Sequence, residues 1–590
     1  MNTFVDYLNS TNNMGGDSTG SLAEKQVTSE YFDQVKVDRT LGNYITESVM
    51  NGDYKAFVLT GHAGDGKTSI LVQILKALNL LSTGEGLKIW NSYDHFYYVK
   101  DLSEIAEDEQ AEVLSKALTM PKCGRTSLLI TNTGPLLKTF HAIATARRAE
   151  ANREFSDTER MTLQNLLLTQ LDENKADMIT IEGYSFYLIN IARLDNVSFA
   201  KKILKKILNP VLWHECENCS AKDECPIHFN RENLSNQFER VSDFVENLYR
   251  YLYENDKRMT IRQMVGHISY GITGNLNCQI IKNTMLKKPK FNYNFANLFF
   301  GYIGITANQD SEQIEGIQHL RRLKLDSISL TDDYKLFVNQ DYTMFNPAIE
   351  ELLQDLNKTY RMHYQVINES NAIMHNKNSS LLEMRRAVRR YYLLYSNLEN
   401  NALLYNQLFG EFFSDYTRLI TKRMSKFQIR NMERVVFDAI YVKNTGMMPE
   451  GDHPLPLTLR REDGAFQNVM LILGEISRTS LTLKQVLIDN AFEDVSDKYR
   501  VVLECKNKLF DLSLPMINYF SDLINGAIVS NNNPALTHGI AKLDAMLLDV
   551  LDAPKADNRE ECEFKVLVNT VKGQKIETFG FANEHTLYVN

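Results

Sequence analysis

Gly61-His62-Ala63-Gly64-Asp65-Gly66-Lys67-Thr68-Ser69 is the stretch that decides the fold of this chain. It matches the phosphate-binding P-loop, whose glycines let backbone N–H groups curl around phosphate oxygens at the start of a helix. An apolar run over 55–60 precedes it, and apolar residues recur at helical spacing over 70–78. Strand, glycine loop and helix therefore occur in the order that a nucleoside triphosphate site requires.

The side chains of this loop also suit a nucleotide and Mg²⁺. We expect Lys67 to reach the β and γ phosphates, and the Thr68 hydroxyl to bind magnesium with Ser69 beside it. The residues expected to bind the nucleotide are Gly61, His62, Ala63, Gly64, Asp65, Gly66, Lys67, Thr68 and Ser69. The alternative is a glycine-rich turn without a ligand, which the flanking strand and helix disfavour.

A second nucleotide motif is expected where the aromatic, β-prone run over 96–99 ends. Asp101 is the candidate Walker B residue, a magnesium-binding carboxylate at the tip of the strand next to the P-loop strand. Glu104 is the candidate for polarising the attacking water, although Leu102 separates it from the position directly after the aspartate. Alternatively, Ser103 and Glu104 only start the following helix, where a carboxylate suits the helix dipole.

Two further strands complete the predicted parallel sheet. The run over 127–131 ends at Asn132, whose amide is expected to hydrogen-bond the attacking water or the γ-phosphate. The alternative for Asn132 is a turn formed with the Gly134-Pro135 pair that follows. Another extended segment, 186–191, closes the core near Arg193. Strands alternate with helices here, as a parallel α/β sheet requires.

A helical lid is predicted to begin at Thr260, which forms a capping box with Gln263. Arg262 then lies on the polar side of the lid helix. In ATPases with such a lid, this arginine reaches the γ-phosphate and couples nucleotide state to lid angle. Arg262 is therefore the first candidate for this role and Arg258 the second, with an ordinary surface arginine as the alternative. The candidate arginine fingers toward a neighbouring subunit are Arg147, Arg148 and Arg193.

A cysteine cluster follows the basic helix predicted over 201–208, whose lysines either touch phosphates or form a solvated face. The cluster contains His214, Cys216, Cys219, Cys225 and His228. Cys-x-x-Cys spacing lets two thiolates hold one tetrahedral zinc, and we expect Cys225 and a histidine, His228 first, to complete a structural Zn²⁺ site. An iron–sulfur cluster and free reduced thiols are the alternatives.

Composition limits the class of protein. A length of 590 residues predicts several domains. The sequence has no apolar run of about 18 residues, so no membrane span is predicted. The sequence over 1–6 lacks the blocks of a secretory signal, and seven cysteines in so long a chain do not predict a disulfide framework, which favours a cytoplasmic location. A net charge of −9 argues against a chain coated in nucleic acid but leaves DNA binding open to local basic faces.

The second half is predicted to consist mainly of amphipathic helices. The helix over 384–392 carries four arginines on one face, which either bind DNA, RNA or an acidic partner, or face carboxylates of the chain itself. Two β-rich pieces are expected over 457–476 and 564–581. A weak nuclease-like pattern combines Asp489 with the Glu504-x-Lys506 pair, for which ordinary strand-end charges are the alternative.

The predicted fold class is an α/β P-loop NTPase, AAA-like with a parallel sheet, a helical lid, a small cysteine-rich insertion and a mostly α-helical C-terminal region with minor β structure. Five segments are expected along the chain. They are an N-terminal leader (1–40), the P-loop ATPase core (41–208), the cysteine-rich insertion expected to bind zinc (209–232), the lid (233–275) and the C-terminal region (276–590).

The Ala63–Thr68 core of the loop, the Cys225-Pro226-Ile227 end of the cysteine cluster and the lid helix ending at Thr273-Gly274 together resemble a known family. Over roughly residues 40 to 275 the chain resembles the DptF ATPases of DNA phosphorothioation-dependent restriction. More broadly, it is similar to AAA-type P-loop ATPases of bacterial anti-phage defence systems. The resemblance implies an ATPase subunit of a restriction complex that works with partner proteins on DNA.

The expected function is ATP binding and hydrolysis, with the lid and helical region transmitting nucleotide state to a protein partner or to DNA. Lys67 and Mg²⁺ would neutralise the phosphates while Glu104 and Asn132 orient water. The activity could depend on a partner or on DNA, and the chain could form homo-oligomers. The alternative is a nucleotide-gated scaffold or signalling switch that hydrolyses little ATP.

Overall fold

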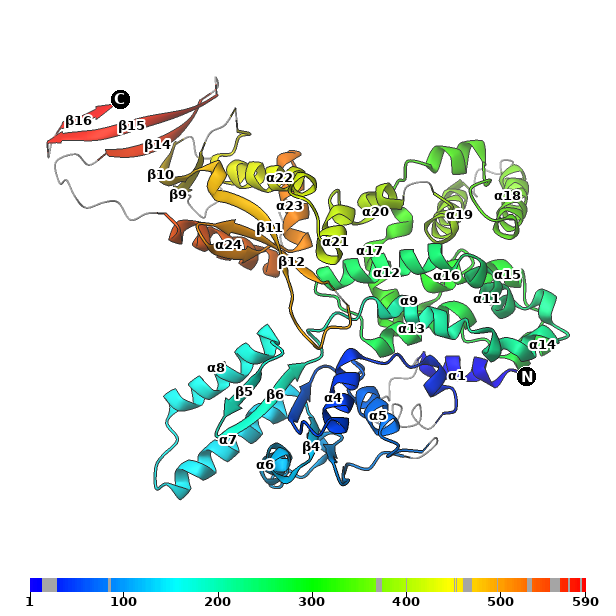
Figure 1. The fold of residues 1–590 in the computed structure, drawn as a ribbon. Helices are drawn as coiled ribbons and strands as arrows, with labels where there is room; N and C mark the ends of the chain where they lie inside the picture. The colour runs from blue at the N-terminus through cyan, green and yellow to red at the C-terminus, as the bar shows by residue number, and fades with distance from the viewer. Residues whose placement is uncertain are drawn as a thin grey trace. The chain divides into compact units, whose positions relative to one another are not determined.

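The computed structural model contains two compact units (Figure 1). Unit 1 comprises Met1–Glu399 together with Asn490–Ser496, and unit 2 comprises Asn400–Asp489 and Asp497–Asn590. The first boundary between the two units therefore falls near residue 400. The structure describes residues 1–12, 29–82, 86–367, 374–398, 401–449, 451, 454–459, 469–495, 497–527, 533–551, 563–570, 573–583 and 586–589.

Unit 1 is built around a six-stranded, mostly parallel sheet with strand order β2-β3-β4-β1-β6-β5. Four adjacent strands are parallel, and the two edge strands, β2 and β5, pair antiparallel. The strands are β1 (Ala56–Thr60), β2 (Trp90–Ser92), β3 (Phe96–Val99), β4 (Thr126–Ile130), β5 (Met178–Ile181) and β6 (Tyr184–Asn190). The predicted α/β class with a largely parallel sheet is thus confirmed.

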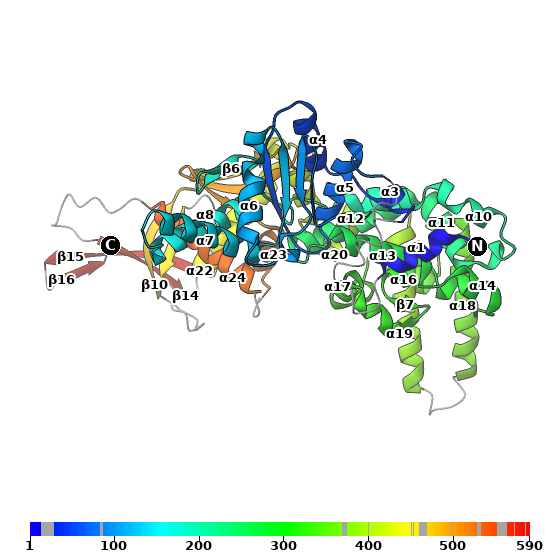
Figure 2. The same cartoon turned by 90° about the horizontal axis from the view of Figure 1, so that it is seen from below.

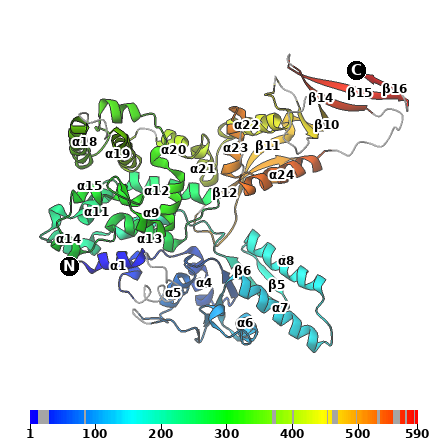
Figure 3. The ribbon, with the colours of Figure 1, turned by 180° about the vertical axis from the view of Figure 1, so that it is seen from behind.

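Helices cover both faces of this sheet, which explains why every residue of β1, β3 and β4 is buried. Side chains alternate along β1, so Phe57 packs with α4 and α5 on one face and Val58 packs with α6, α7 and α8 on the other. The helices are α4 (Thr40–Met50), α5 (Lys67–Ala77), α6 (Gln110–Thr119), α7 (Thr133–Glu150) and α8 (Asp157–Glu173). Figure 3 shows α7 and α8 beside β5 and β6.

One detail of the predicted sheet is wrong. The strand that ends before Asp101, β3, is not next to the P-loop strand, because β4 pairs with β1 on one side and with β3 on the other. A crossover can carry the chain past one strand position, so consecutive parallel strands need not be neighbours. The place in the sheet between β3 and β1 is taken by β4, and Asn132 follows the carboxyl end of β4.

A helical layer forms the rest of unit 1 (Figure 2). The predicted capping box is confirmed at the start of α13, where Thr260 and Gln263 bond each other's backbone. The helices from α1 to α13 in this layer are α1 (Thr3–Thr11), α3 (Phe32–Val35), α9 (Phe199–Ile207), α10 (His214–Glu217), α11 (Pro226–Asn236), α12 (Phe238–Glu254) and α13 (Ile261–Thr273). The later ones are α14 (Cys278–Asn283), α15 (Pro289–Asn292), α16 (Phe295–Phe299), α17 (Glu315–Leu323), α18 (Pro347–Ile367) and α19 (Met374–Tyr395), and β7 (Tyr302–Ile303) pairs with β8 (Thr306–Ala307).

The start of the expected leader is a packed helix. Phe4 and Leu8 of α1 are fully buried, and Asn9 Nδ2 donates to the carbonyl oxygen of Leu276 at 2.9 Å. The Asn2 side chain caps α1 and also donates to the carbonyl oxygen of Leu212. Residues 1–12 are therefore part of the helical layer of unit 1. Residues 13–28 of the expected leader lie outside the described residues.

The arginine-rich helix contacts carboxylates of its own unit. Arg390 is fully buried and pairs with Asp326 at 2.8 Å, and Arg389 pairs with Asp333 at 2.6 Å. These contacts fit the interpretation in which the arginines of this helix face carboxylates of the chain itself. Arg385, at the exposed end of the row, keeps an exposed side chain.

The basic helix over 201–208 corresponds to α9, and its lysines also have partners within the chain. Lys201 pairs with Glu239 at 2.6 Å, and Lys206 donates to the carbonyl oxygen of Lys36. The apolar side of α9, with Ile203 and Leu204, is buried. This arrangement fits the interpretation in which α9 has a buried apolar face and a solvated face that carries the lysines.

Unit 2 contains more β structure than the predicted minor pieces. Its two antiparallel sheets have the orders β16-β15-β14-β10-β9 and β11-β12-β13. The strands are β9 (Leu455–Leu459), β10 (Val469–Ile476), β11 (Leu481–Leu487), β12 (Tyr499–Cys505), β13 (Lys508–Asp511), β14 (Glu563–Thr570), β15 (Gly573–Asn583) and β16 (Thr586–Val589). The helices are α20 (Asn401–Phe409), α21 (Phe413–Thr421), α22 (Lys426–Thr445), α23 (Leu514–Ile524) and α24 (Pro534–Asp549).

Both predicted β-rich pieces form antiparallel pairs, β9 with β10 and β14 with β15. The residues between β9 and β10, including Asp463 and Gly464, lie outside the described residues. Glu504 of the nuclease-like pattern bonds Thr482 and pairs with Lys484, as expected of ordinary strand-end charges. Among the described residues, no helix combines the length and apolar character needed to cross a membrane.

Candidate functional site

The predicted P-loop follows β1 and leads into α5, as the sequence pattern requires. Gly61, Gly64 and Gly66 have φ values of +149°, +89° and +90°, a region that favours glycine. At Gly64, an added Cβ would also lie 3.0 Å from the Thr260 hydroxyl. The glycines therefore serve both the turn of the loop and the close approach of the start of α13.

Asp65 holds the shape of this loop. Its carboxylate is fully buried, accepts a hydrogen bond from the His62 backbone N–H at 2.8 Å and pairs with Arg258. Arg258 also donates to the carbonyl oxygen of Ile191 at 3.3 Å, after β6. Because Asp65 pairs with Arg258, its carboxylate holds the conformation of the loop, and Arg258 links the segment before α13 to the loop and to the end of β6.

A cavity of about 480 Å³ lies over the loop and brings the candidate residues together. Its volume is within the range of small-ligand sites. Seven of the nine loop residues line it, namely His62, Ala63, Gly64, Gly66, Lys67, Thr68 and Ser69. The same cavity is lined by all five residues predicted to act in catalysis, Lys67, Asp101, Glu104, Asn132 and Arg262. These residues follow the ends of three strands, β1, β3 and β4, or belong to helix α13.

Lys67 lies at the centre of these candidates. Its Nζ donates to the carbonyl oxygens of Gly61 and His62 at 2.5 and 3.1 Å, and to Asn132 Oδ1 at 3.4 Å. Burial lowers the pKa of Lys67, and Arg262 lowers it further, whereas Asp65 and Asp101 act in the opposite direction. These hydrogen-bond partners are neutral oxygens. The positive charge of the Lys67 ammonium can therefore attract an anionic ligand.

Asp101 and Glu104 lie at the end of β3. Asp101 caps the short 3₁₀ helix Leu102–Glu104, and its Oδ1 accepts from the backbone and hydroxyl of Ser103 at 2.9 and 2.7 Å. Glu104 pairs with Lys100 at 2.9 Å. Ser103 and Glu104 therefore do start a short helix, as the alternative interpretation expected. The carboxylates of Asp101 and Glu104 still line the cavity.

Asn132 and Arg262 approach the cavity from two other elements. Asn132 follows β4 at the start of α7, beside the Lys67 ammonium. The backbone N–H of Arg262 donates to the Gly64 carbonyl at 3.2 Å, so the first turn of α13 rests on the P-loop. Burial lowers the pKa of the Arg262 guanidinium. Of the two lid arginines, Arg262 is the one that lines the cavity.

The three candidate arginine fingers have partners elsewhere in unit 1. Arg147 lies over the ring of Tyr184 at 4.4 Å. Arg148 pairs with Glu182 at 2.9 Å, and Arg193 pairs with Asp172 at 2.6 Å. Within the part of the chain that the structure describes, these three arginines do not line the cavity.

One wall of the cavity was missed by sequence reasoning. Phe32, Val35 and Val37 add apolar surface, and Arg39 adds a buried guanidinium. The alternation of Val35, Lys36 and Val37 indicates a half-buried segment, but only the fold shows that it returns to the P-loop.

Arg39 is held by a segment from far along the chain. Its Nη2 and Nε donate to Asp494 Oδ2 at 2.6 and 2.9 Å, and its Nη1 donates to the Asp65 carbonyl at 3.4 Å. Residues 490–495, which we term the inserted segment, connect β11 to β12 but belong to unit 1. Phe492 of this segment is buried, with its ring 5.3 Å from that of Tyr44 and 5.9 Å from that of Tyr187.

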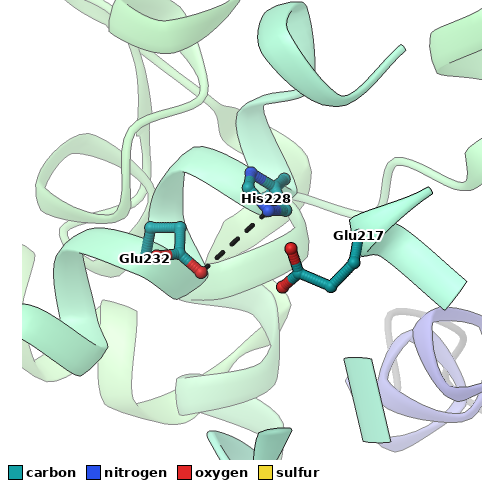
Figure 4. Close-up of side chains that lie close together, drawn as sticks. All are labelled: Glu217, His228 and Glu232. Atoms are coloured by element: carbon teal, nitrogen blue, oxygen red, sulfur yellow. Dashed lines mark ion pairs between the residues drawn. The ribbon is translucent and has the colours of Figure 1, made fainter. Parts of the chain in front are cut away.

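The predicted histidine of the zinc site lies among carboxylates (Figure 4). Ligand atoms of Glu217, His228 and Glu232 lie within 4.8 Å of one another. Arg231 contacts both glutamates, and Lys222 pairs with Glu217 at 2.7 Å, so basic side chains already neutralise this group. Burial lowers the pKa of His228. The arrangement is an ion-pair network around His228, whose Nε2 lies 4.0 Å from the Glu232 carboxylate.

The comparisons with known proteins give no match to a family model, a curated protein or a solved structure. The functional argument therefore depends on the cavity and its residues.

Proposed function

We propose that this protein is a P-loop ATPase of AAA-like type that binds and hydrolyses ATP. One observation carries the proposal: the phosphate-binding loop and all five candidate catalytic residues line a single cavity. The cavity lies at the carboxyl ends of parallel strands, where α/β sheets bind their ligands. Since β4 lies between β1 and β3, Asn132 is placed between the strand that precedes Lys67 and the strand that precedes Asp101.

The proposed chemistry is positional. The loop backbone and Lys67 bind the β and γ phosphates, and Arg262 reaches the γ-phosphate from the lid. Asn132 and Glu104 orient the attacking water, with Glu104 released from its pair with Lys100. Substrate binding between the loop and α13 couples nucleotide state to the position of the lid.

The residues present also fit a magnesium ion. The Thr68 hydroxyl and the Asp101 carboxylate line the same cavity, and both are oxygen ligands of the kind that Mg²⁺ prefers. When bound, the ion would neutralise charge on the phosphates. Thr68 and Asp101 would hold it directly or through water.

The biological role proposed from the family resemblance is that of an ATPase subunit in a DNA restriction or anti-phage complex. In that role, ATP state would control engagement of a protein partner or DNA. A second candidate is a nucleotide-gated scaffold with little hydrolysis. The ion pair of Glu104 with Lys100 favours it, because this carboxylate must leave its partner before it can orient water.

The test is ATP binding and hydrolysis by the full chain, with and without double-stranded DNA. Lys67→Ala removes the phosphate-binding ammonium, and Lys138→Ala is the matched control, because Lys138 is an exposed lysine outside the cavity. The expected result is turnover in the wild type and in Lys138→Ala, and loss of turnover in Lys67→Ala. Tight ATP binding without turnover in any condition would favour the scaffold, and wild-type turnover by Lys67→Ala would refute the site.

A further inference from the structure

A groove of unit 2 gathers arginines around an exposed aromatic ring. It has a volume of about 920 Å³ and lies between the first half of α22 and the start of β11. Figure 1 shows these two elements side by side, and the Leu483 backbone N–H donates to Glu433 Oε2 at 2.9 Å between them. All residues that line the groove belong to unit 2, so its shape depends on that unit alone.

Helical spacing places the groove side chains of α22 on one face. Phe427, Arg430 and Arg434 follow one another at intervals of three and four residues, which brings them to the same side of a helix. The opposite side packs into unit 2 through buried residues that include Ile429 and Val436. The face with Phe427 and the two arginines therefore turns outward into the groove.

The other wall comes from the short helical turn Arg478–Ser480 and the first residues of β11. It adds Arg478 and two threonines to the groove. The Arg478 guanidinium lies over the Phe437 ring at 4.6 Å and is 3.9 Å from the Asp438 carboxylate. These contacts hold the guanidinium in place while a third of the side chain stays exposed, at 34%. Three arginines from two separate elements thus face one groove.

The positive charge around the groove has few partners within the chain. Five of the thirteen residues over 422–434 are basic and one, Glu433, is acidic. The Glu433 carboxylate already accepts a backbone hydrogen bond from β11. Among the described residues, Lys426, Arg430 and Arg434 take part in no ion pair, whereas the two buried arginines of α19 each pair with an aspartate. The groove is therefore a local attractor for a polyanion on a chain whose net charge is −9.

Phe427 adds a stacking surface beside these cations. Its side chain is 83% exposed, although phenylalanine belongs to the residue types most often buried. Single-stranded nucleic acids bind where bases stack on aromatic rings and guanidinium groups hold the phosphates. A duplex keeps its bases stacked inside, and an acidic peptide has no planar base to stack. The exposed ring therefore favours a single strand.

The neutral polar side chains of the groove are already engaged. Gln428 completes the capping box of α22, and the Thr482 hydroxyl donates to Glu504 Oε2 at 3.3 Å. Asn431 Oδ1 accepts from Arg434 Nη2 at 3.3 Å. Reading base edges or a 2′-hydroxyl requires hydrogen-bonding groups of this kind. With these groups engaged, the groove suits contacts to phosphates and base faces, which DNA supplies without a 2′-hydroxyl.

We propose that this groove binds single-stranded DNA without sequence preference. The residues that make the contacts are Phe427, Arg430, Arg434 and Arg478. The arginines bind successive phosphates and displace their counterions, and Phe427 stacks on one base. The binding goes beyond the proposed ATPase activity, because the groove lies in unit 2 and the nucleotide cavity lies in unit 1.

The test is fluorescence anisotropy of a labelled oligothymidine of about 20 nucleotides, titrated with the full chain in the absence of ATP. Phe427→Ala should weaken binding about fivefold or more, because the stacked ring is lost. Arg430→Ala should also weaken binding, and it should reduce the slope of log K against log salt by about 0.7, as expected for one phosphate contact fewer on a single strand. The matched controls Leu509→Ala and Arg500→Ala alter exposed side chains of unit 2 outside the groove and should bind as the wild type does.

Several results would overturn the proposal. One is wild-type DNA that fails to bind, or binding that is equal in Arg430→Ala and Arg500→Ala. Wild-type affinity in Phe427→Ala would refute the stacked single strand. Competition by polyglutamate as effective as that by unlabelled oligothymidine would assign the groove to an acidic protein, and a strong preference for oligouridine would contradict binding without a sugar contact.

The Lys67→Ala variant separates this proposal from the ATPase proposal. It should bind oligothymidine as the wild type does, because Lys67 lies in unit 1. Absence of ATP hydrolysis in the wild type would therefore leave the DNA result unchanged. Loss of DNA binding in Lys67→Ala would contradict the assignment of the site to the groove of unit 2.

Discussion

Replacing Asp494 by asparagine removes the charge that faces Arg39 in the core of unit 1. Arg39 is 1% exposed and Asp494 is 2% exposed, so water cannot replace the lost partner. The carboxylate accepts two hydrogen bonds from the guanidinium and one from the Thr40 backbone at 2.8 Å. The amide of the Asp494→Asn variant would keep the shape of the side chain but leave a buried guanidinium without a counter-charge.

The magnitude follows from the burial of the pair. Breaking a buried ion pair by removing one partner costs about 3–5 kcal/mol. For a unit of about 400 residues, the average unfolding entropy is about 0.8 kcal/mol/K, so the melting temperature of unit 1 should fall by about 4–6 °C. ATP should also bind more weakly, because Arg39 lines the cavity and contacts the Asp65 carbonyl.

Differential scanning fluorimetry of the full chain measures this change. Asp172→Asn is the matched control, since Asp172 pairs with Arg193 in the same unit with exposures of 67% and 56%, and its loss should cost under about 1 kcal/mol. The double variant Arg39→Met/Asp494→Leu should recover most of the stability, because it removes both charges. An unchanged melting temperature in Asp494→Asn, or no recovery in the double variant, would refute the reasoning.

Two further predictions concern a buried histidine and the site. Complete burial lowers the pKa of His267 to about 4, so the unfolded chain binds its proton first and stability should fall by about 3 kcal/mol as the pH drops from 6.5 to 4. Acid unfolding followed by fluorescence should show a shallower pH dependence in His267→Asn, and an identical slope would contradict the assignment. Asn132→Ala should lower kcat about 100-fold or more while ATP affinity changes little, since it removes a donor used in the transition state. An equal loss of affinity, measured by nucleotide titration, would instead assign Asn132 to binding.

Local features of unit 1 could be predicted from the sequence. The strand–loop–helix order over 56–77 and the capping box of Thr260 with Gln263 depend on residues a few positions apart, and both are confirmed. The gathering of Asp101 and Asn132 at one cavity also follows from parallel strands, whose carboxyl ends share one edge of a sheet.

Features set by distant contacts could not be predicted. The pairing of Arg39 with Asp494 joins residues 455 positions apart, and neither side chain carries a local signal of burial. The order of β3 and β4 was missed because alternating strands and helices fix strand direction but not strand neighbours.

The inserted segment has a consequence for how the protein is made. A ribosome releases the whole of 1–399 before it has synthesised Phe492 and Asp494, so the nascent N-terminal unit waits with an unfilled aromatic pocket and an uncompensated Arg39. Its folding can be completed only when about half of unit 2 has left the ribosome. A chain shortened to its first 399 residues would keep that defect permanently, which makes unit 1 dependent on synthesis of the chain through residue 495.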